Sequence, residues 1–360
     1  MTLHVGLVGP LPPPNGGMAM QTRQLAELLR AQKIEVSQLA TNRPYRPAFV
    51  GRVRGVRALF RLLPYLVGAW RLAGRVDVIH LMANSGWSWQ LFSAPVLWIA
   101  TLRKTPVIVN YRGGEALSYF QQSFSRVKLS LKMARSVVVP SGYLEAVFQQ
   151  FNVKTSIIPN IIDLNRFSQR PMVKTRGGFT LIVTRNLEAI YGIEMAIKAV
   201  SLLQEKIDGL ELKIAGSGPQ LDELTALVYN LKLQGTVTFS GRIDREDISS
   251  FYQSADVMLN PTTVDNMPNS ILEALASGVA VVSTDVGGVP YLVEDETTAL
   301  LVKSGDEAQM ADAILRLYQD RGLKERLVEN GIRAVSQYAW PRVKDLWLGH
   351  YRAAIQGTAV

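Results

Sequence analysis

Two carboxylates stand eight residues apart in the segment DNMPNSILEALASG, which spans residues 265–278. Asp265 lies in a loop-like stretch, and Glu273 lies in the first turns of an apolar helical pattern that Asn269 or Ser270 can cap. Free N–H groups at a helix start bind phosphate, and a carboxylate near that end also suits the helix dipole. The pattern alone therefore leaves two interpretations open, a phosphate-binding helix start or a well-capped structural helix.

Two glycine-containing turns are further candidate phosphate sites. Gly16 and Gly17 lie between the first predicted strand and the first helix, where backbone can approach a ligand closely, although a tight turn alone can also require glycine. The segment AGSGPQL at 215–221 follows a strand but lacks the third glycine of a dinucleotide-binding fingerprint. The turn after the first strand does not fit that fingerprint either. These departures count against an enzyme that uses NAD or FAD, and we expect no cofactor.

Short apolar strands alternate with helical patterns along the chain, which is typical of parallel βαβ units. The predicted strands are 4–9, 34–39, 77–82, 105–111, 136–141, 156–160, 179–185, 210–216, 236–241, 257–261, 279–285 and 298–302. A polar linker at 168–178 separates two such series. The sequence therefore predicts an α/β protein with two Rossmann-like, doubly wound domains that face a central cleft. Ligands of such sheets bind at the carboxyl ends of the strands.

The composition limits the class of protein. The chain has no cysteine, which excludes disulfides and thiolate metal sites, and its three histidines are scattered. The first residues lack the basic and apolar regions of a signal peptide, and the longest apolar run, 91–102, is too short to span a bilayer. We therefore expect a cytoplasmic protein without a metal site.

The charge is divided unevenly between the two halves. Residues 1–165 carry 19 Lys and Arg against 6 Asp and Glu, whereas residues 166–360 carry 20 against 24. The asymmetry indicates an anionic partner for the first half, with nucleic acid, anionic lipid and a diphosphate-bearing substrate as candidates. No recognised nucleic-acid-binding module is present in that half, so nucleic acid is not an expected partner.

A basic amphipathic pattern precedes Pro64, which we expect to kink or split its helix. Its apolar and basic faces are Val53, Val56, Phe60, Leu63 and Val67 against Arg54, Arg57 and Arg61. Phe60, Tyr65 and Trp70 add aromatic residues suited to a membrane interface. The pattern fits either an ordinary core helix with a solvated basic face or a helix on an anionic bilayer. We favour the second, with peripheral association at the inner face of the membrane.

A series of motifs in a fixed order resembles a known family across nearly the whole chain. The motifs are GG at 16–17, VVVPS at 137–141, IPNIIDLNRF at 158–167, IVTRNLEAIYG at 182–192, IAGSGP at 214–219, TFSGRI at 238–243, DNMPNSILEALASGVAVVSTDVGGVPYLV at 265–293 and YAW at 338–340. The most specific of them is 265–293. The sequence is similar to family-4 retaining glycosyltransferases of the glycosyltransferase-B fold.

The resemblance implies a division of labour between the domains. Residues 1–167 would form an acceptor domain, on which a C-terminal helix at about 341–360 packs back. Residues 168–340 would bind the donor, a UDP- or GDP-linked nucleotide-diphosphate sugar. The acceptor would be a saccharide or a lipid-linked saccharide in exopolysaccharide or cell-envelope glycan synthesis. Members of the family typically need no metal.

The resemblance also implies roles for single residues. Glu273 would bind the donor ribose, Asp265 the donor sugar, and Arg185 the diphosphate, whose departing charge a fixed guanidinium stabilises. The remaining donor contacts would be the amides of Asn269, Ser270, Ile271 and Leu272 with Gly16 and Gly17 at the diphosphate, and Gly241, Arg242 and Ile243 along the nucleobase.

Three positions depart from the family pattern. Asp265 replaces the usual glutamate, Tyr191 stands where a lysine is usual, and Arg112 stands where a histidine is usual. Arg112 would supply the positive charge that the lysine provides in other family members, and Glu115 could orient it. His80 could face the ligand or pack under the sheet.

The aromatic segment at 84–90 allows two interpretations. Trp87 and Trp89 could stack on a sugar or lipid acceptor, or could simply be buried in the core. Rival functions are a non-catalytic nucleotide-sugar-binding protein and a nucleotide-sugar epimerase of the same fold.

Overall fold

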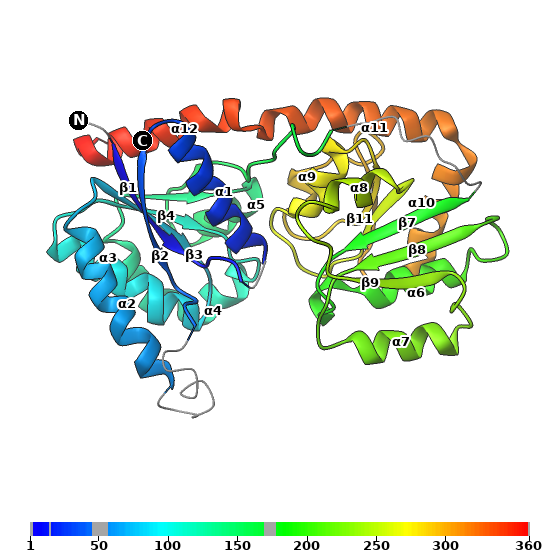
Figure 1. Ribbon diagram of the computed structural model, residues 1–360, viewed down its shortest axis with the longest axis horizontal. Helices are drawn as coiled ribbons and strands as arrows, with labels where there is room; N and C mark the ends of the chain where they lie inside the picture. Colours follow the sequence, from blue (N-terminus) through cyan, green and yellow to red (C-terminus); the bar gives the residue numbers. More distant parts are fainter. Residues whose placement is uncertain (1–2, 14–15, 45–56, 169–177, 359–360) are drawn as a thin grey trace. The chain divides into compact units, whose positions relative to one another are not determined.

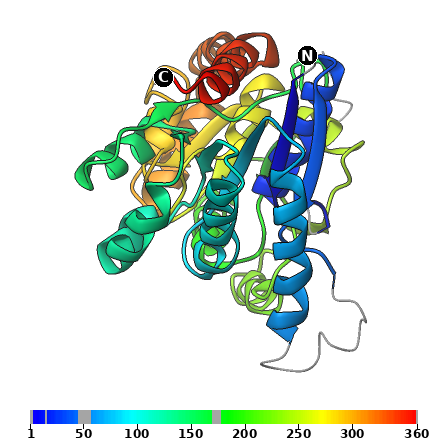
Figure 2. The same ribbon diagram turned by 90° about the vertical axis from the view of Figure 1, so that its left-hand side faces the viewer.

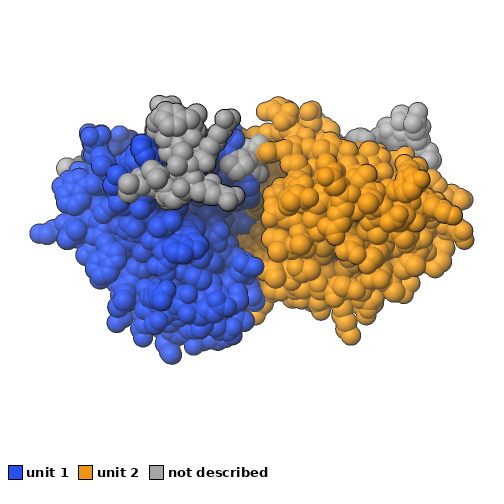
Figure 3. All heavy atoms as spheres, turned by 90° about the horizontal axis from the view of Figure 1, so that it is seen from below, with its two compact units in different colours: residues 1–161, 340–360 blue, residues 162–339 orange. Residues whose placement is uncertain are grey.

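A computed structural model describes residues 3–13, 16–44, 57–168 and 178–358 of the chain. The chain forms two compact units, unit 1 with residues 1–161 and 340–360, and unit 2 with residues 162–339 (Figures 1 and 3). The boundary expected from the sequence was 167/168. The difference arises because Ile162 and Phe167 pack in the core of unit 2, and Ile162 pairs with Ala339 in a short parallel bridge.

Unit 1 contains a six-stranded parallel sheet in the order β2-β1-β3-β4-β5-β6. The strands are β1 (His4–Gly9), β2 (Glu35–Ala40), β3 (Val78–Ala83), β4 (Val107–Tyr111), β5 (Ser136–Val139) and β6 (Ser156–Ile157). The helices are α1 (Gly17–Ala31), α2 (Arg57–Ala73), α3 (Ala94–Leu102), α4 (Ala116–Leu131), α5 (Gly142–Gln150) and α12 (Trp340–Gln356), with a π-helical turn at Trp89–Ser93.

Helices cover both faces of this sheet. The buried side chains of α2, α3, α4 and α5 pack on one face, and those of α1 and α12 pack on the other. Figures 1 and 2 show α12 on the opposite side of the sheet from α2 and α3. The period-2 alternation of buried strand residues, with Leu7 facing α1 and Val8 facing α2, divides the core into these two layers.

Unit 2 contains a second six-stranded parallel sheet in the order β12-β11-β10-β7-β8-β9. The strands are β7 (Phe179–Thr184), β8 (Leu210–Ala215), β9 (Val237–Gly241), β10 (Val257–Asn260), β11 (Ala280–Thr284) and β12 (Leu300–Val302). The helices are α6 (Ile193–Ser201), α7 (Leu221–Asn230), α8 (Ile248–Gln253), α9 (Asn269–Ala276), α10 (Glu307–Gln319) and α11 (Arg321–Val335), with short 3₁₀ turns at Ala189–Tyr191, Val289–Tyr291 and Ser336–Tyr338.

Two helical layers also enclose the sheet of unit 2. Side chains of α6, α7 and α10 form one core, and side chains of α8 and α9 form the other. The strand order reverses between β7 and β10 in unit 2 and between β1 and β3 in unit 1. Ligands of doubly wound sheets bind at the carboxyl ends of the strands at such reversal points. The predicted α/β class with two doubly wound parallel sheets is confirmed.

The helix around Pro64 departs from its prediction in part. Helix α2 is continuous from Arg57 to Ala73 with Pro64 inside it, so it is not split. Tyr65 is buried and its hydroxyl donates to the carbonyl oxygen of Phe92 (3.0 Å), so it belongs to the core rather than to an interfacial face. The predicted positions before residue 57, including Val53, Arg54 and Val56, lie outside the described residues.

Candidate functional site

The carboxyl edge of the unit 2 sheet gathers three residues singled out in the sequence. Arg185 follows β7 at the reversal point, and its guanidinium forms an ion pair with Asp265. Its Nε and one terminal nitrogen also donate to Oδ1 of Asn260, at 3.0 and 2.7 Å. The guanidinium carbon lies 5.1 Å from the centre of the Tyr191 ring, a cation–π distance. Arg185 is therefore held in one orientation by a carboxylate, an amide and an aromatic ring.

Asn260 was not singled out in the sequence, although it left a signal there. It is the last residue of β10, a strand whose other three residues are apolar and buried. Its side chain is fully buried, accepts from Arg185 and donates to Oγ of Ser283 (2.9 Å). A buried polar side chain must find partners. A polar residue that ends an apolar strand at the carboxyl edge is thus a candidate for holding a site residue.

The glycines of the segment AGSGPQL explain how Arg185 is placed. A Cβ on Gly216 would lie 1.9 Å from the carbonyl oxygen of Arg185, and a Cβ on Gly218 would lie 2.3 Å from that of Leu187. The absence of side chains lets the loop after β8 pack directly against the backbone that follows β7. The structural role of these glycines is therefore close backbone packing beside Arg185.

A second pair of glycines holds the loop that carries Asp265. Cβ atoms on Gly287 and Gly288 would lie 2.1 Å from the carbonyl oxygen of Asp265 and 1.7 Å from that of Asn266. The N–H of Gly288 donates to the Asp265 carbonyl (3.0 Å), and the Asn266 N–H donates to Asp265 Oδ1 (2.8 Å). Both carboxylate oxygens of Asp265 accept hydrogen bonds within unit 2, and each keeps a further lone pair.

Helix α9 begins at Asn269, so neither Asn269 nor Ser270 occupies the N-cap position. Pro268 is the N-cap, and Asn269 and Ser270 are the first two helical residues, so the predicted cap by either side chain is wrong. Proline fits the position because its fixed φ suits the extended N-cap backbone. Oγ of Ser270 is buried without a hydrogen-bond partner among the described residues. The helix start formed by Asn269, Ser270, Ile271 and Leu272 thus contains a buried hydroxyl that the described protein groups leave unsatisfied.

Glu273 lies one turn into α9 and is held by a tyrosine. The Tyr252 hydroxyl donates to Glu273 Oε2 (2.9 Å), and because it has a single hydrogen it accepts from Oγ1 of Thr184 (2.7 Å). Burial raises the pKa of Glu273 to about 7, and the Tyr252 hydrogen bond and the positive charges of Arg166 and Arg185 limit the rise. Glu273 therefore titrates near neutral pH when no ligand is bound.

The predicted nucleobase residues lie at the other end of the same sheet edge. Gly241 ends β9, and its carbonyl oxygen accepts from the N–H of Gly216 (2.7 Å) beside the Arg185 backbone. Gly241 and Arg242 are exposed, and Ile243 is partly buried. The structure therefore leaves the residues after β9 accessible.

Arg112 in unit 1 has a different environment from Arg185. It follows β4, and its guanidinium donates from Nε to Asn110 Oδ1 (3.2 Å) and from a terminal nitrogen to Asn160 Oδ1. Burial lowers the pKa of Arg112 to about 10. Among the described residues no carboxylate pairs with it, and Glu115 is exposed at the start of α4. The predicted orientation of Arg112 by Glu115 is therefore not present, because two amides hold the guanidinium.

His80 is a core residue. It is fully buried in β3, with hydrogen bonds to the Tyr351 hydroxyl (2.8 Å) and the Asn110 side chain (2.9 Å). Burial and the charge of Arg112 lower the pKa of His80 to about 3, so the ring is neutral at physiological pH. Of the two sequence interpretations, packing under the sheet is the one observed, and His80 cannot contact a ligand directly in this state.

One tryptophan of the segment 84–90 is buried in the core and the other is exposed to a ligand, so each of the two interpretations applies to one of them. Trp89 is buried and its indole N–H donates to Oγ of Ser130 (3.0 Å). Trp87 is 78% exposed and follows β3, next to the carboxyl edge of the unit 1 sheet. Of these two tryptophans, Trp87 is thus the one available to a ligand.

Nothing in the described structure requires a glycine at position 16, after β1. Gly16 is the N-cap of α1 with φ −81°, and a Cβ there would meet no described atom within 4 Å. Gly17 is exposed and is the first residue of α1. Open space at a helix start at the sheet reversal point is where a ligand can approach the backbone.

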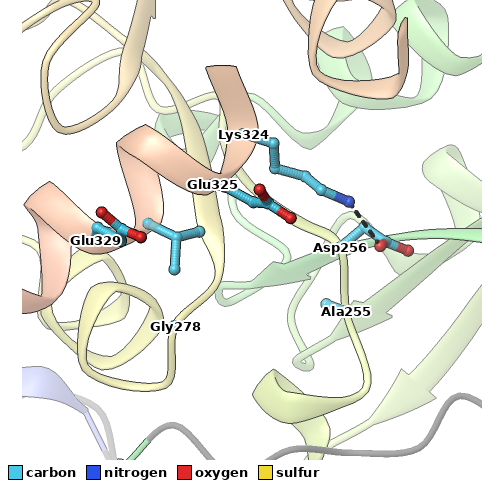
Figure 4. A pocket seen from close by; sticks show the side chains of 7 residues that line it. Ala255, Asp256, Gly278, Lys324, Glu325 and Glu329 are labelled. Atoms are coloured by element: carbon cyan, nitrogen blue, oxygen red, sulfur yellow. Dashed lines mark hydrogen bonds and ion pairs between the residues drawn. The ribbon is translucent and has the colours of Figure 1, made fainter. Parts of the chain in front are cut away.

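A pocket of about 250 Å³ elsewhere in unit 2 lies at the wrong edge of the sheet (Figure 4). Its lining includes Asp256 and Gly278, which precede β10 and β11, and Lys324, whose ammonium pairs with Asp256 (3.2 Å). These positions mark the amino ends of the strands, whereas ligands of such sheets bind at the carboxyl ends. The pocket is therefore not the candidate site.

Metal ligands and membrane spans are both absent from the described ranges. Those ranges contain no group of three or more His, Asp or Glu side chains placed to hold a metal ion. None of their helices combines the length and apolar character needed to cross a membrane.

Two family models match consecutive parts of the chain. The model described as Glycosyltransferase Family 4 matches residues 15–166, and the model described as Glycosyl transferases group 1 matches residues 167–334. A phosphatidyl-myo-inositol mannosyltransferase from Mycobacterium leprae is 26% identical over 348 residues, which cover 90% of each chain. Further curated relatives align over 42–56% of their own length.

Solved structures share the fold over the whole chain. Sucrose-phosphate synthase from Thermosynechococcus elongatus is 22% identical with a TM-score of 0.79, covering 99% of this chain and all of the other. HepE from Anabaena, solved in complex with UDP, is 18% identical with a TM-score of 0.77, covering 98% of this chain and all of the other. The chain therefore belongs to the family-4 glycosyltransferases and has the glycosyltransferase-B fold.

Proposed function

We propose that the protein transfers a sugar, with retention of configuration, from a UDP- or GDP-linked donor to a saccharide or lipid-linked acceptor. The pathway would be exopolysaccharide or cell-envelope glycan synthesis. The observation that carries the proposal is the cluster at the carboxyl edge of the unit 2 sheet. There lie the fixed guanidinium of Arg185, the unsatisfied hydroxyl of Ser270 at a helix start, and the half-buried carboxylate of Glu273.

Each group of the cluster suits one part of a nucleotide-sugar. The first-turn amides and the Ser270 hydroxyl offer donors to a diphosphate, and Arg185 adds a positive charge. Glu273 offers carboxylate oxygens to the ribose hydroxyls. Asp265 orients Arg185 and keeps lone pairs for a hydroxyl of the donor sugar. The accessible segment 241–243 would lie along the nucleobase.

Unit 1 supplies the remaining assigned groups. Gly16 and Gly17 would offer backbone to the diphosphate, and Arg112 a second cation. Exposed Trp87 is the assigned acceptor residue, since an aromatic face stacks on the apolar face of a sugar ring. Glu115 is exposed at the start of α4, where it would contact the acceptor.

In the proposed reaction the acceptor hydroxyl attacks the anomeric carbon from the face that the diphosphate leaves. The carbon–oxygen bond to the phosphate breaks with its electron pair on the leaving oxygen, and that phosphate takes the proton of the acceptor hydroxyl. Arg185 stabilises the negative charge that develops on the leaving group. No carboxylate nucleophile is needed, so Asp265 and Glu273 act by holding the donor.

The proposal is tested by screening nucleotide-sugar donors for binding and then measuring their turnover with and without an acceptor. Thermal-shift measurements against UDP, GDP and their sugars identify the nucleotide, and a donor-hydrolysis and transfer assay follows. Glu273→Ala should lose most activity and keep the fold. Turnover of donor to an isomeric nucleotide-sugar without acceptor would indicate an epimerase. Binding without any turnover would indicate a non-catalytic nucleotide-sugar-binding protein, and wild-type rates for Glu273→Ala would overturn the assignment of the site.

We also propose that unit 1 associates with the inner face of the membrane. Exposed apolar side chains line α2 and the neighbouring α3, namely Phe60, Leu63, Val67, Trp70, Trp98 and Leu102. The Arg103 guanidinium lies 5.0 Å over the Trp70 ring, and Arg71 and Arg75 are exposed nearby. Apolar side chains bordered by cations match the acyl region and the anionic head groups of a bilayer.

Vesicle flotation distinguishes this surface from an ordinary exposed face. The wild-type protein should float with vesicles that contain anionic lipid and remain soluble with zwitterionic ones. Leu63→Glu with Trp70→Glu should abolish flotation without lowering transfer to a soluble acceptor. A matched control, Tyr229→Glu, changes an exposed aromatic residue in unit 2 and should float as the wild type does. Equal flotation of all variants would contradict the assignment.

A further inference from the structure

A continuous chain of hydrogen bonds, buried except at the Arg112 end, joins Arg112 to the C-terminal helix. His80 and Asn110 lie on neighbouring strands β3 and β4, and both are fully buried. They share the face of the sheet covered by α12, where Met82 and Ile108, the alternating neighbours on each strand, pack with Trp347 and Tyr351. Two polar side chains of the sheet therefore lie within a largely apolar layer.

The chemistry of the partners fixes the direction of every bond. The Nε of Arg112 can only donate, so Asn110 must present its oxygen to it (3.2 Å). The amide nitrogen of Asn110 then donates to His80 Nε2 (2.9 Å). Since Nε2 accepts, the hydrogen of the neutral ring lies on Nδ1 and is donated to the Tyr351 hydroxyl oxygen (2.8 Å). The chain runs in one direction, from Arg112 to α12.

Packing holds the far end of this chain. The His80 ring lies against Trp347, with 4.4 Å between ring centres, and Trp347 and Tyr351 are fully buried. A 180° turn of the Asn110 amide would place its N–H₂ group against the Nε–H of Arg112. The His80 ring could adapt by moving its hydrogen to Nε2, but the Arg112 Nε–H, which can only donate, would lose its acceptor, and leaving such a group unsatisfied costs more than the bond contributes. The amide and the ring thus have a single satisfied arrangement.

We propose that Asn110 and His80 are positioning residues that fix the Arg112 guanidinium and couple its orientation to α12 through Tyr351. The inference rests on the proposed role of Arg112 at the donor. Arg112 has no carboxylate partner among the described residues, so two neutral amides set its direction and leave its charge available to an anionic ligand. A family member with a histidine in place of Arg112 would present a different group to Asn110.

The first experiment needs no activity. Long-range ¹H–¹⁵N spectra of protein labelled at histidine report which ring nitrogen carries the hydrogen, and the chain contains three histidines. His80 should show the neutral Nδ1–H form from pH 6 to 8. In Asn110→Asp the carboxylate can only accept, so the hydrogen should move to Nε2. An Nε2–H or doubly protonated His80 in the wild type would overturn the proposal.

The second experiment separates positioning from stability. Asn110→Asp should lower kcat about 10- to 100-fold with little change in the donor KM, because the carboxylate neutralises Arg112 and displaces it. In an Arg112→Gln background the same change should have almost no further effect on kcat. The control Ser130→Ala removes another buried hydrogen bond of unit 1, to Trp89, and should leave kcat unchanged.

The outcomes distinguish the positioning role from the proposed function. If the wild-type protein transfers no sugar from any donor, the proposed function fails, and the histidine spectra still decide whether the chain of bonds exists. If the wild type is active and Asn110→Asp lowers kcat equally with and without Arg112, then Asn110 acts through the fold alone. That result would overturn the positioning role even if the Nδ1–H form were observed.

Discussion

Arg185 and Arg112 occupy similar places in the two sheets but are held in opposite ways. Each directly follows a central strand of its sheet, β7 in unit 2 and β4 in unit 1. Arg185 pairs with a carboxylate, Asp265, whereas Arg112 is held by the amides of Asn110 and Asn160. A neutral partner fixes direction without cancelling charge, and burial accordingly lowers the pKa of Arg112 to about 10.

The difference indicates different demands on the two cations. Without ligand the charge of Arg185 is shared with Asp265, so an arriving diphosphate must compete for it. The charge of Arg112 has no such competitor among the described residues, and two neutral amides offset its desolvation only in part, as its lowered pKa indicates. The ion pair in unit 2 therefore stabilises Arg185 without a ligand. In unit 1 the charge of Arg112 would be stabilised by an anion that binds beside it.

The largest expected effect is the loss of catalysis in Arg185→Gln. Glutamine keeps a donor for Asn260 but removes the charge that faces the leaving diphosphate, so kcat should fall by about 10³-fold. Arg316→Gln removes an exposed arginine of the same unit, paired with Glu296, and should keep the wild-type rate. Steady-state kinetics with saturating donor measures both. A loss below tenfold in Arg185→Gln would place the catalytic charge elsewhere.

Stability should distinguish the two arginines in a second way. Arg185→Gln leaves Asp265 partly buried without its cation and should lower the free energy of unfolding by about 1–3 kcal/mol. Arg112→Gln leaves no orphaned carboxylate and should change it by less than about 1 kcal/mol. Urea unfolding measures both. Arg185→Gln combined with Asp265→Asn should recover most of the loss, and equal losses in the two single variants would remove the contrast.

The sequence was sufficient for the elements and for several charged residues that follow the strands. The twelve predicted strands correspond to β1–β12 with ends shifted by a few residues, because apolar runs in parallel sheets are buried on both faces. Arg185, Asp265 and Tyr191 meet as neighbours because each follows the same reversal point, which the strand order places at one edge.

Side-chain partners could not be predicted from the sequence because they depend on which strands become neighbours. Asn260 holds Arg185 and Tyr252 holds Glu273, and in both pairs the separation along the chain is too long for a local pattern to encode. Asn110 differs, because it lies only two residues before Arg112. His80 illustrates the same limit, since the return of α12 to unit 1 supplies Tyr351 as its partner. The helix cap at α9 was missed because proline and asparagine both fit that boundary.

The pH dependence of donor use should come from unit 2 alone. Burial raises the pKa of Glu273 to about 7, so kcat/KM for the donor should rise about tenfold per pH unit below 7 and level off above it, as the carboxylate that accepts from ribose forms. Glu273→Gln should be slower and flat across this range. His80 has a pKa of about 3 and stays neutral throughout. A slope that persists in Glu273→Gln would assign the titration to another group.

The same titration has a consequence for stability. The folded-state pKa of Glu273 lies above its ordinary value, so its contribution to the free energy of unfolding is complete below about pH 4.5 and is lost as the pH rises through about 7. Glu273→Gln should therefore be more stable than the wild type at pH 8, with the difference vanishing at acid pH. Urea unfolding at the two pH values measures this.

The smallest expected effect concerns the aromatic partner of Arg185, which has no counterpart at Arg112 in the described residues. The Tyr191 ring lies 5.1 Å from the guanidinium, and such an interaction contributes about 0.5–1 kcal/mol at a partly exposed site. Tyr191→Leu should therefore lower kcat/KM by about two- to fivefold, while Tyr191→Phe, which keeps the ring, should stay within about twofold of the wild type. If Tyr191→Phe were as impaired as Tyr191→Leu, the hydroxyl rather than the ring would be the functional group. Tyr191 would then act on the ligand directly, and Arg185 would be oriented by Asp265 and Asn260 alone.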